Sequence, residues 1–204
     1  MIAIINYGLG NVRAFANLYK LMNVPVAIAT RRQDIEGASK LILPGVGAFD
    51  HAMEMLDASG MRETLDEMVL RQAVPVLGVC VGMQMLAGSS EEGRLSGLGW
   101  IDGRVRRFDH ATLRPPPRLP HMGWNDVVPR PQARLFAGLE QEARFYFLHS
   151  YYFDCTSSEN VLATSEYGIA FGSAVSSKNV YGVQFHPEKS HDYGVRLLKN
   201  FAEL

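Results

Sequence analysis

Short apolar runs alternate with helical patterns through the first half of the chain. The runs have the length of strands and lie at residues 2–6, 25–29, 40–43 and 74–79. Between them, at 12–22, 49–58 and 61–71, apolar residues recur every three or four positions, the period of a helix with one buried face. Parallel strands need long crossover connections, for which helices are the usual solution. The alternation therefore predicts βαβ units around a buried parallel sheet.

The segment from residue 98 to 181 has a different pattern. Strand candidates, separated by Pro and Gly, lie at 104–108, 144–149, 161–166, 169–176 and 180–185. We expect them to add antiparallel or mixed sheet to the parallel core. The pattern at 193–201 predicts a closing helix, and the proline-rich segment 114–118 predicts a surface loop. The fold class is therefore α/β.

Length and composition limit the function. A chain of 204 residues with 47% hydrophobic residues can form one core, so we expect one domain over residues 1–204. The net charge of -1 argues against a nucleic-acid partner. There is no apolar run of about 18 residues, so no membrane span is expected, and the N-terminus resembles a strand more than a signal peptide. With only two cysteines, Cys80 and Cys155, a reducing, cytoplasmic location is expected.

Cys80 stands where an apolar strand runs directly into a helical segment. Gly78 and Gly82 flank it at minus two and plus two, which is the cysteine form of a G-x-S-x-G nucleophile elbow. The tight turn exposes the nucleophile, and glycine lets neighbouring chain approach closely. A helix N-terminus also favours the thiolate. The alternative is a buried structural cysteine in a glycine-rich turn.

His186 follows an apolar strand, and Glu188 lies two residues further on. Residues two apart in extended chain share a face, so the carboxylate could hold one imidazole nitrogen and direct the other toward a thiol. This is the nucleophile, base and orienting-group arrangement of a triad. Taken alone, His-Pro-Glu is more often a turn at a strand end.

The segment Leu-Pro-Gly-Val-Gly at 43–47 also follows a strand, and we expect it at the same edge of the sheet as Cys80. Its backbone N–H groups could bind an oxyanion, with the amide of Val81 as a second donor. Alone, it would be interpreted as a simple strand-to-helix turn.

Other motifs fail. Gly8 and Gly10 resemble the start of a dinucleotide fingerprint, but Arg13 occupies the third glycine position. His186 and His191 lack a zinc-site spacing, so neither a metal nor a cofactor is expected. Cys155 has no elbow and is expected to be structural. The arginines at 104, 106 and 107 are expected to form a solvated strand face.

The elbow at 78–84, the loop at 44–47 and His186-Pro187-Glu188 together resemble the class I (triad) glutamine amidotransferases, in the family's order and over nearly the whole chain. The segments 120–125 and 147–151 resemble a subgroup of glutaminase subunits that work with a separate cyclase subunit. The resemblance implies a three-layer sandwich around a mostly parallel mixed sheet. It also implies hydrolysis of L-glutamine and a heterodimer in which a cyclase or synthase partner uses the ammonia.

The resemblance also implies roles for individual residues. Cys80 would attack the side-chain amide of glutamine, giving a thioester and ammonia. His186 would protonate the ammonia and later activate water, and Glu188 would orient His186. The oxyanion hole would come from the backbone of Val46, Gly47 and Val81. Four residues would hold glutamine: Gln84, His149, Ser150 and Tyr151. Three would face the partner: Asn11, Trp124 and Lys189.

The sequence departs from the family pattern at a few positions. The first strand ends in Asn6 where an Asp is common, Ala14 replaces a small hydroxyl residue, and Val81 replaces a common Leu. A paralogous group, which supplies ammonia for amidino groups on surface-polysaccharide sugars, is similar as well. A stand-alone cysteine hydrolase and a non-catalytic binding module are further alternatives. We also expect weak activity without the partner. The partner is expected to activate the enzyme by rearranging the backbone at 45–47.

Overall fold

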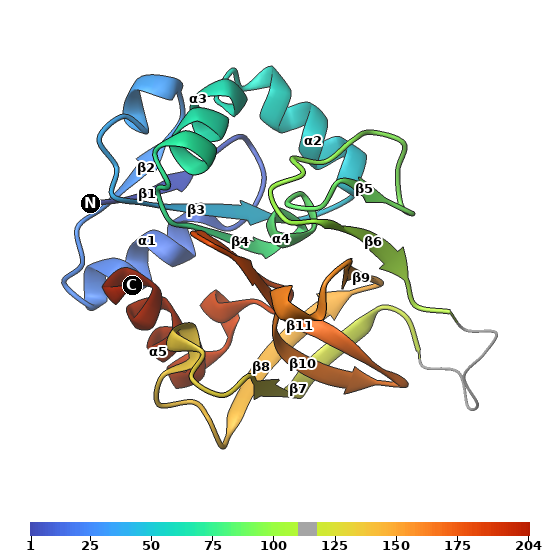
Figure 1. Ribbon diagram of the computed structural model, residues 1–204. Coiled ribbons are helices and arrows are strands. Elements are labelled where there is room, and N and C mark those ends of the chain that lie inside the picture. Colours follow the sequence, from blue (N-terminus) through green and yellow to red (C-terminus); the bar gives the residue numbers. More distant parts are fainter. Residues whose placement is uncertain (110–117) are drawn as a thin grey trace.

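The computed structural model describes residues 1–109 and 118–204, so most of the predicted proline-rich loop at 114–118 lies outside the described residues. Within them, the chain forms a twelve-stranded mixed sheet with helices on both sides (Figure 1). The main path of the sheet runs β2-β1-β3-β4-β12-β11-β10-β7-β8.

The first five strands of this path are parallel. The sequence predicts four of them, whereas the strand expected at 180–185, predicted as part of the antiparallel or mixed segment, instead joins the parallel core beside β4. They are β2 (Val26–Ala29), β1 (Ile2–Ile5), β3 (Lys40–Gly45), β4 (Val76–Cys80) and β12 (Val180–Val183). Helices α1 (Val12–Leu21) and α5 (His191–Glu203) cover one face, and α2 (Phe49–Ala58) and α3 (Arg62–Asp66) cover the other (Figure 1). Strands β1 and β4 are buried along their whole length, which explains their uninterrupted apolar sequence.

The second half of the chain continues the sheet with antiparallel strands. On the main path these are β11 (Ile169–Ser177), β10 (Val161–Tyr167), β7 (His121–Pro129) and β8 (Ala143–His149). A branch consists of β5 (Ser89–Ser90), β6 (Gly103–Arg107) and β9 (Tyr151–Cys155), with β9 pairing to β11. The sequence patterns do not predict β7 or β9, because polar residues and glycine interrupt the apolar alternation of β7.

One helix prediction needs correction. The helix expected at 61–71 is α-helical only from Arg62 to Asp66 and continues as a π-helical turn over Glu67–Arg71. Asn11, a good N-cap by residue type, makes no side-chain capping hydrogen bond to α1. Its ψ of 63° is outside the extended range in which an N-cap side chain reaches the first free amides.

The ends of β3 and β4 are in close backbone contact. Gly45 stands opposite Cys80 in the register of the two strands. A Cβ on Gly82 would collide with the carbonyl oxygen of Leu43, and a Cβ on Gly45 would collide with the amide nitrogen of Gly82. Glycine at these positions therefore lets the cysteine turn pack directly against the loop at 44–47.

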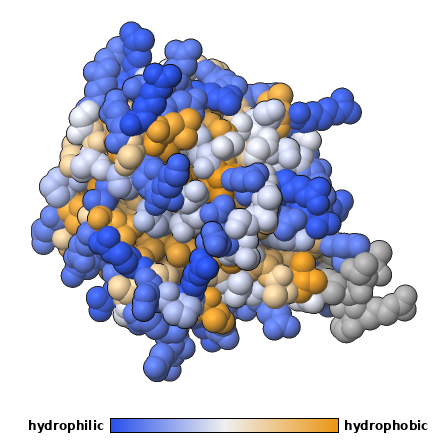
Figure 2. All heavy atoms as spheres, viewed as in Figure 1, coloured by the Kyte–Doolittle hydropathy of each residue, from blue (hydrophilic) through white to orange (hydrophobic). Residues whose placement is uncertain are grey.

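On the face drawn in Figure 2, hydrophilic side chains are interspersed with smaller apolar areas. None of the helices in the described ranges combines the length and apolar character that crossing a membrane requires.

Candidate active site

Cys80 is the last residue of β4 and directly precedes the short helix α4 (Val81–Gln84), as the elbow motif predicts. Its φ of 56° and ψ of −114° lie in a region that side-chain-bearing residues rarely occupy. Strained backbone of this kind clusters at functional sites, where the surrounding structure holds it. The residue is 5% exposed and lines a pocket, so its thiol can meet a small ligand.

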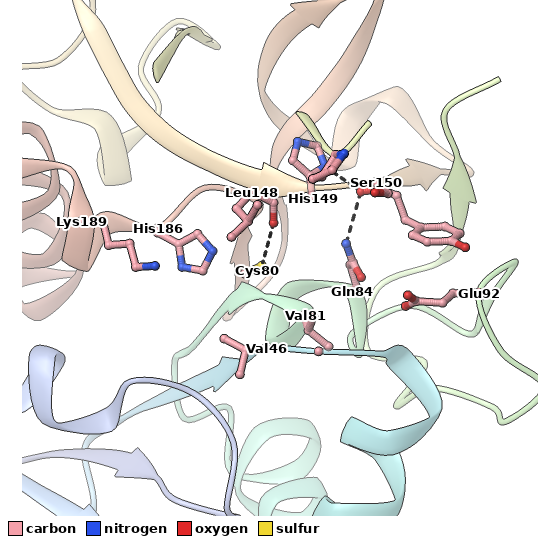
Figure 3. A pocket seen from close by; sticks show the side chains of 13 residues that line it. Val46, Cys80, Val81, Gln84, Glu92, Leu148, His149, Ser150, His186 and Lys189 are labelled. Atoms are coloured by element: carbon pink, nitrogen blue, oxygen red, sulfur yellow. Dashed lines mark hydrogen bonds between the residues drawn. The ribbon is translucent and has the colours of Figure 1, made fainter. Parts of the chain in front are cut away.

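His186 and Glu188 form a buried pair beside Cys80. The imidazole Nδ1 lies 2.9 Å from the Glu188 Oε1, and the two side chains are 6% and 4% exposed. The carboxylate accepts from Nδ1–H, which leaves Nε2 for the thiol, and Figure 3 shows the ring turned toward Cys80. One detail of the prediction is wrong: β12 ends at Val183, and Glu188 lies in a 3₁₀ turn over Pro187–Lys189 rather than in extended chain.

The electrostatic environment keeps a proton on His186. Burial alone would lower the pKa of this imidazole. Hydrogen bonds with Cys80 and Glu188, together with the electrostatic interactions of the same two side chains, outweigh burial and raise the pKa to about 10. At neutral pH the site therefore holds an imidazolium, which can protonate a leaving amine.

Ser190 connects the turn at His186 to β8 by hydrogen bonds. Its hydroxyl donates to the His186 carbonyl at 2.6 Å and accepts from the Tyr146 amide at 3.0 Å. The His186 amide in turn donates to the Tyr146 carbonyl at 2.9 Å. Since Ser190 is fully buried, these bonds hold the imidazole in place without competition from water.

A pocket of about 280 Å³ opens above Cys80 (Figure 3). Its lining contains every residue predicted for the nucleophile, the base, the oxyanion hole and the glutamine site: Val46, Gly47, Cys80, Val81, Gln84, His149, Ser150, Tyr151 and His186. Four further residues complete it: Glu92, Pro120, Leu148 and Lys189. The fold thus brings together the last residues of β4 and β8 and the segments that follow β3 and β12 in the chain.

Gln84 and Gln184 form a polar connection from the pocket wall to the thiol. The Gln84 amide nitrogen donates to the Tyr151 carbonyl at 3.2 Å and to the Gln184 Oε1 at 3.0 Å. Gln184 is fully buried, and its Nε2 lies 3.9 Å from the Cys80 Sγ. Sequence reasoning missed Gln184; its only signal is a polar side chain within an apolar run.

Glu92 is a second residue that the sequence patterns missed. One carboxylate oxygen accepts from the Phe49 amide at the start of α2, at 2.9 Å. The side chain points into the pocket across from Ser150 (Figure 3). The sequence offers no signal for it, because it lies in a charged loop next to another glutamate.

The three residues predicted at a partner interface lie in two places, and of the three only Lys189 lines the pocket. Lys189 is exposed at the pocket, with its ammonium 5.8 Å from the centre of the Tyr146 ring. Trp124 packs against the same tyrosine edge-on and stacks on His191 at 5.5 Å. Asn11 is exposed and follows Gly10, at which a Cβ would collide with Pro44. It therefore belongs to a segment that packs against the loop at 44–47.

Comparison with known proteins defines the class. The family model described as "Glutamine amidotransferase class-I" matches residues 4–204. The chain belongs to this family. It is 59% identical over 204 residues to the imidazole glycerol phosphate synthase subunit HisH of Bdellovibrio bacteriovorus, and 48% identical to HisH of Leptospira interrogans, with all of each chain covered. A protein named HisH 2, from Pseudomonas aeruginosa, is 47% identical, again with all of both chains covered.

Solved structures support the fold. A glutamine amidotransferase crystal structure superimposes with a TM-score of 0.75 at 20% identity, covering 100% of this chain and 99% of that one. A glutamine amidotransferase from Thermotoga maritima gives a TM-score of 0.64 at 18% identity, covering 99% of this chain and 82% of that one. At such identities the likeness concerns the fold alone, and it confirms the predicted fold class.

Proposed function

We propose that this chain is the glutaminase subunit of an imidazole glycerol phosphate synthase. It hydrolyses L-glutamine to glutamate and ammonia, and a cyclase subunit uses the ammonia in histidine biosynthesis. The observation that carries the glutaminase activity is the arrangement of Cys80, His186 and Glu188 at one end of the pocket. The full-length identity of 59% to a relative named HisH supports the particular pathway and partner.

The reaction follows from this arrangement. The Cys80 sulfur attacks the carboxamide carbon of glutamine, and the carbon–nitrogen bond breaks as His186 gives its proton to the leaving ammonia. This leaves a thioester on Cys80. The neutral His186 then takes a proton from water, and the resulting hydroxide attacks the thioester to release glutamate. Glu188 holds the ring orientation through both steps.

The negative oxygen that develops in each step needs donors. We propose the amide of Val81, next to the nucleophile, together with the backbone of Val46 and Gly47. The register that sets Gly45 opposite Cys80 supports this, since it brings the following residues to the nucleophile. Gly47 has a φ of 90°, a conformation in which glycine is unstrained and the peptide can reorient. This freedom supports a backbone switch at 45–47.

Two groups of side chains would hold the substrate. Gln84 and the segment His149, Ser150 and Tyr151 form one wall of the pocket, and we propose that they orient glutamine. Glu92 supplies a carboxylate on the pocket lining, and we propose that it binds the α-ammonium group of glutamine.

Replacing Glu92 with Gln tests this assignment. We expect KM for glutamine to rise about 10- to 100-fold with a much smaller change in kcat, because a charge-assisted bond made equally in ground and transition states is lost. Glu91→Gln is the matched control, since that carboxylate faces Arg106 and the Arg107 amide instead of the pocket. A glutamine analogue without the amino group should react equally poorly with the wild type and with Glu92→Gln. Equal KM values in the wild type and Glu92→Gln would refute the assignment.

An exposed apolar surface supports the partner. Strand β7 turns Met122, Trp124 and Val128 outward, and Leu148 stands opposite Met122 on β8. Leu148 also lines the pocket, and its carbonyl lies 3.9 Å from the Cys80 Sγ. A protein docked on this surface, with Lys189 beside it, would therefore contact the wall of the glutaminase site. We propose that Asn11, whose segment packs against the loop at 44–47, extends the interface on that side. We also propose a cytoplasmic location, where reducing conditions keep a catalytic thiol free.

The test is to co-purify the chain with the cyclase subunit of the same organism and to follow glutamate and the nitrogen acceptor. We expect weak glutaminase activity alone and at least about tenfold more in the complex, because the partner gates the active site. With the cyclase's nitrogen acceptor supplied and glutamine as the nitrogen source, we expect imidazole glycerol phosphate to form. Transfer of nitrogen to a sugar by a different partner would support the amidino-sugar alternative. Full activity alone, on amides other than glutamine, would support a stand-alone hydrolase.

A further inference from the structure

A hydrogen-bond network of four groups lies behind the glutamine pocket. The His149 Nδ1 lies 2.7 Å from the Tyr151 carbonyl oxygen, and its Nε2 lies 2.9 Å from the His121 Nδ1. The His121 Nε2 lies 3.3 Å from the Asn125 side-chain nitrogen. The groups come from β7, β8 and β9, so the network crosses the layer that forms one wall of the pocket.

The groups at the two ends of this network determine which ring nitrogens of His121 and His149 carry a proton. A carbonyl oxygen can only accept, so the His149 Nδ1 must carry a proton. The Asn125 amide nitrogen can only donate, and its orientation is fixed because it also donates to the Glu166 carbonyl at 2.9 Å while its oxygen accepts from the Asp126 amide. The His121 Nε2 must therefore accept, its Nδ1 must donate, and the His149 Nε2 must accept. Both ends lead to the same assignment, with both rings neutral and protonated on Nδ1.

The surroundings favour this uncharged pair. His121 and His149 are 3% and 6% exposed, and His121 is sandwiched between the rings of Tyr167 and Phe147 at 3.9 and 4.8 Å. A second proton on either ring would point one N–H group at another donor. In agreement, burial lowers the pKa of His121 to about 4. Burial also lowers the pKa of His149, to about 3, and outweighs the hydrogen bond to Tyr151, which alone would raise it.

We infer that His121 is a positioning residue: it holds His149 in the one tautomer that can donate to the Tyr151 carbonyl, and so sets the backbone of 149–151 in the wall of the glutamine pocket. The same carbonyl accepts from Gln84, so two side chains converge on one backbone oxygen. Without the His121 donor, His149 can move its proton to Nε2, and its bond to Tyr151 is then lost. This inference rests on the proposed glutaminase function for its kinetic consequence.

The kinetic test uses three variants in the complex with the cyclase subunit. His121→Phe keeps the stacked ring and removes the donor, and we expect KM for glutamine to rise about tenfold with kcat changed less than about threefold, the scale of one lost hydrogen bond. In His121→Asn the amide nitrogen takes the place of Nδ1, so about half of the increase in the logarithm of KM should be recovered. Tyr167→Phe is the control, since it keeps the ring on His121 and removes only a hydroxyl bonded to the Arg118 carbonyl.

The nitrogen NMR spectrum of the imidazole rings is the second readout. In the wild type, both rings should show a protonated Nδ1 and an unprotonated Nε2. In His121→Phe the proton of His149 should move to Nε2. A wild-type His149 protonated on Nε2, or an unchanged KM in a folded His121→Phe variant, would overturn the inference. If the wild type lacks glutaminase activity, the proposed function fails, while the tautomers are still measurable and decide the hydrogen-bond assignment separately.

Discussion

Replacing Cys80 with Ala is expected to abolish glutamine hydrolysis, lowering kcat by at least about 10⁴-fold, because no other group lining the described pocket can form the thioester. The substitution removes one sulfur atom at a position whose strained backbone is set by the packing of Gly45 and Gly82. We therefore expect the variant to fold and to bind glutamine and the partner. Steady-state release of glutamate, with and without the cyclase, measures the effect.

Cys155 is the matched control. It lies at the end of β9 outside the pocket, and burial followed by the charges of Asp154 and Asp102 raises the pKa of its thiol to about 12. Cys155→Ala should therefore retain kcat within about twofold, as expected for a cysteine without a catalytic role. An electrophilic glutamine analogue should label Cys80 and spare Cys155. Undiminished turnover in Cys80→Ala would contradict the glutaminase mechanism.

Glu188→Gln is the second large effect that we expect. The amide preserves the shape of the side chain but removes the charge that helps keep His186 protonated. The second oxygen, Oε2, is buried without a hydrogen-bond partner among the described residues, so the new amide group would also lack one. We expect kcat to fall about 10²- to 10⁴-fold, up to the scale on which a serine protease triad loses activity when its orienting carboxylate is replaced. Glu203→Gln is the control: its carboxylate forms an exposed ion pair with Lys199, so kcat should stay unchanged.

The same variant makes a prediction about pH. The folded state raises the pKa of His186 from 6.5 to about 10 through Cys80 and Glu188 together, so the stability that the protonated His186 gains from them is complete below pH 6.5 and is lost as pH rises through 10. In Glu188→Gln the NMR titration midpoint of His186 should fall toward its ordinary value. The difference in melting temperature between wild type and variant should be largest in mildly acidic solution and should shrink toward pH 10. A wild-type midpoint near 6.5 would be incompatible with the proposed ion pair.

Local patterns predicted the parts of the site that depend on residues close together in the chain. The elbow around Cys80 is a strand-to-helix turn between two glycines, and its geometry follows from a few consecutive residues. The pair of His186 and Glu188 is equally local, although a 3₁₀ turn rather than extended chain forms it. The resemblance of these motifs to a family led to the pocket residues, which the structure brings together.

Residues without such a motif were missed for a physical reason. Gln184, Glu92 and His121 act through partners far away in the chain, such as Gln84, the Phe49 amide and His149. Strand β7 was missed for a related reason: its inward residues His121 and Asn125 are polar, because they bond to one another and to β8 and β10. Alternation of apolar and polar residues predicts a strand only when the buried face is apolar.

The sequence by itself determined the βαβ core, the nucleophile turn and the histidine–glutamate pair, because helix and strand periods and glycine turns are encoded over a few residues. Tertiary structure alone decided that β12 pairs with β4, which carries His186 to Cys80 from the far end of the chain. It also decided the proton positions of His121 and His149, since a tautomer depends on the partner of each ring nitrogen. Those partners are chosen by packing between segments that are distant in sequence.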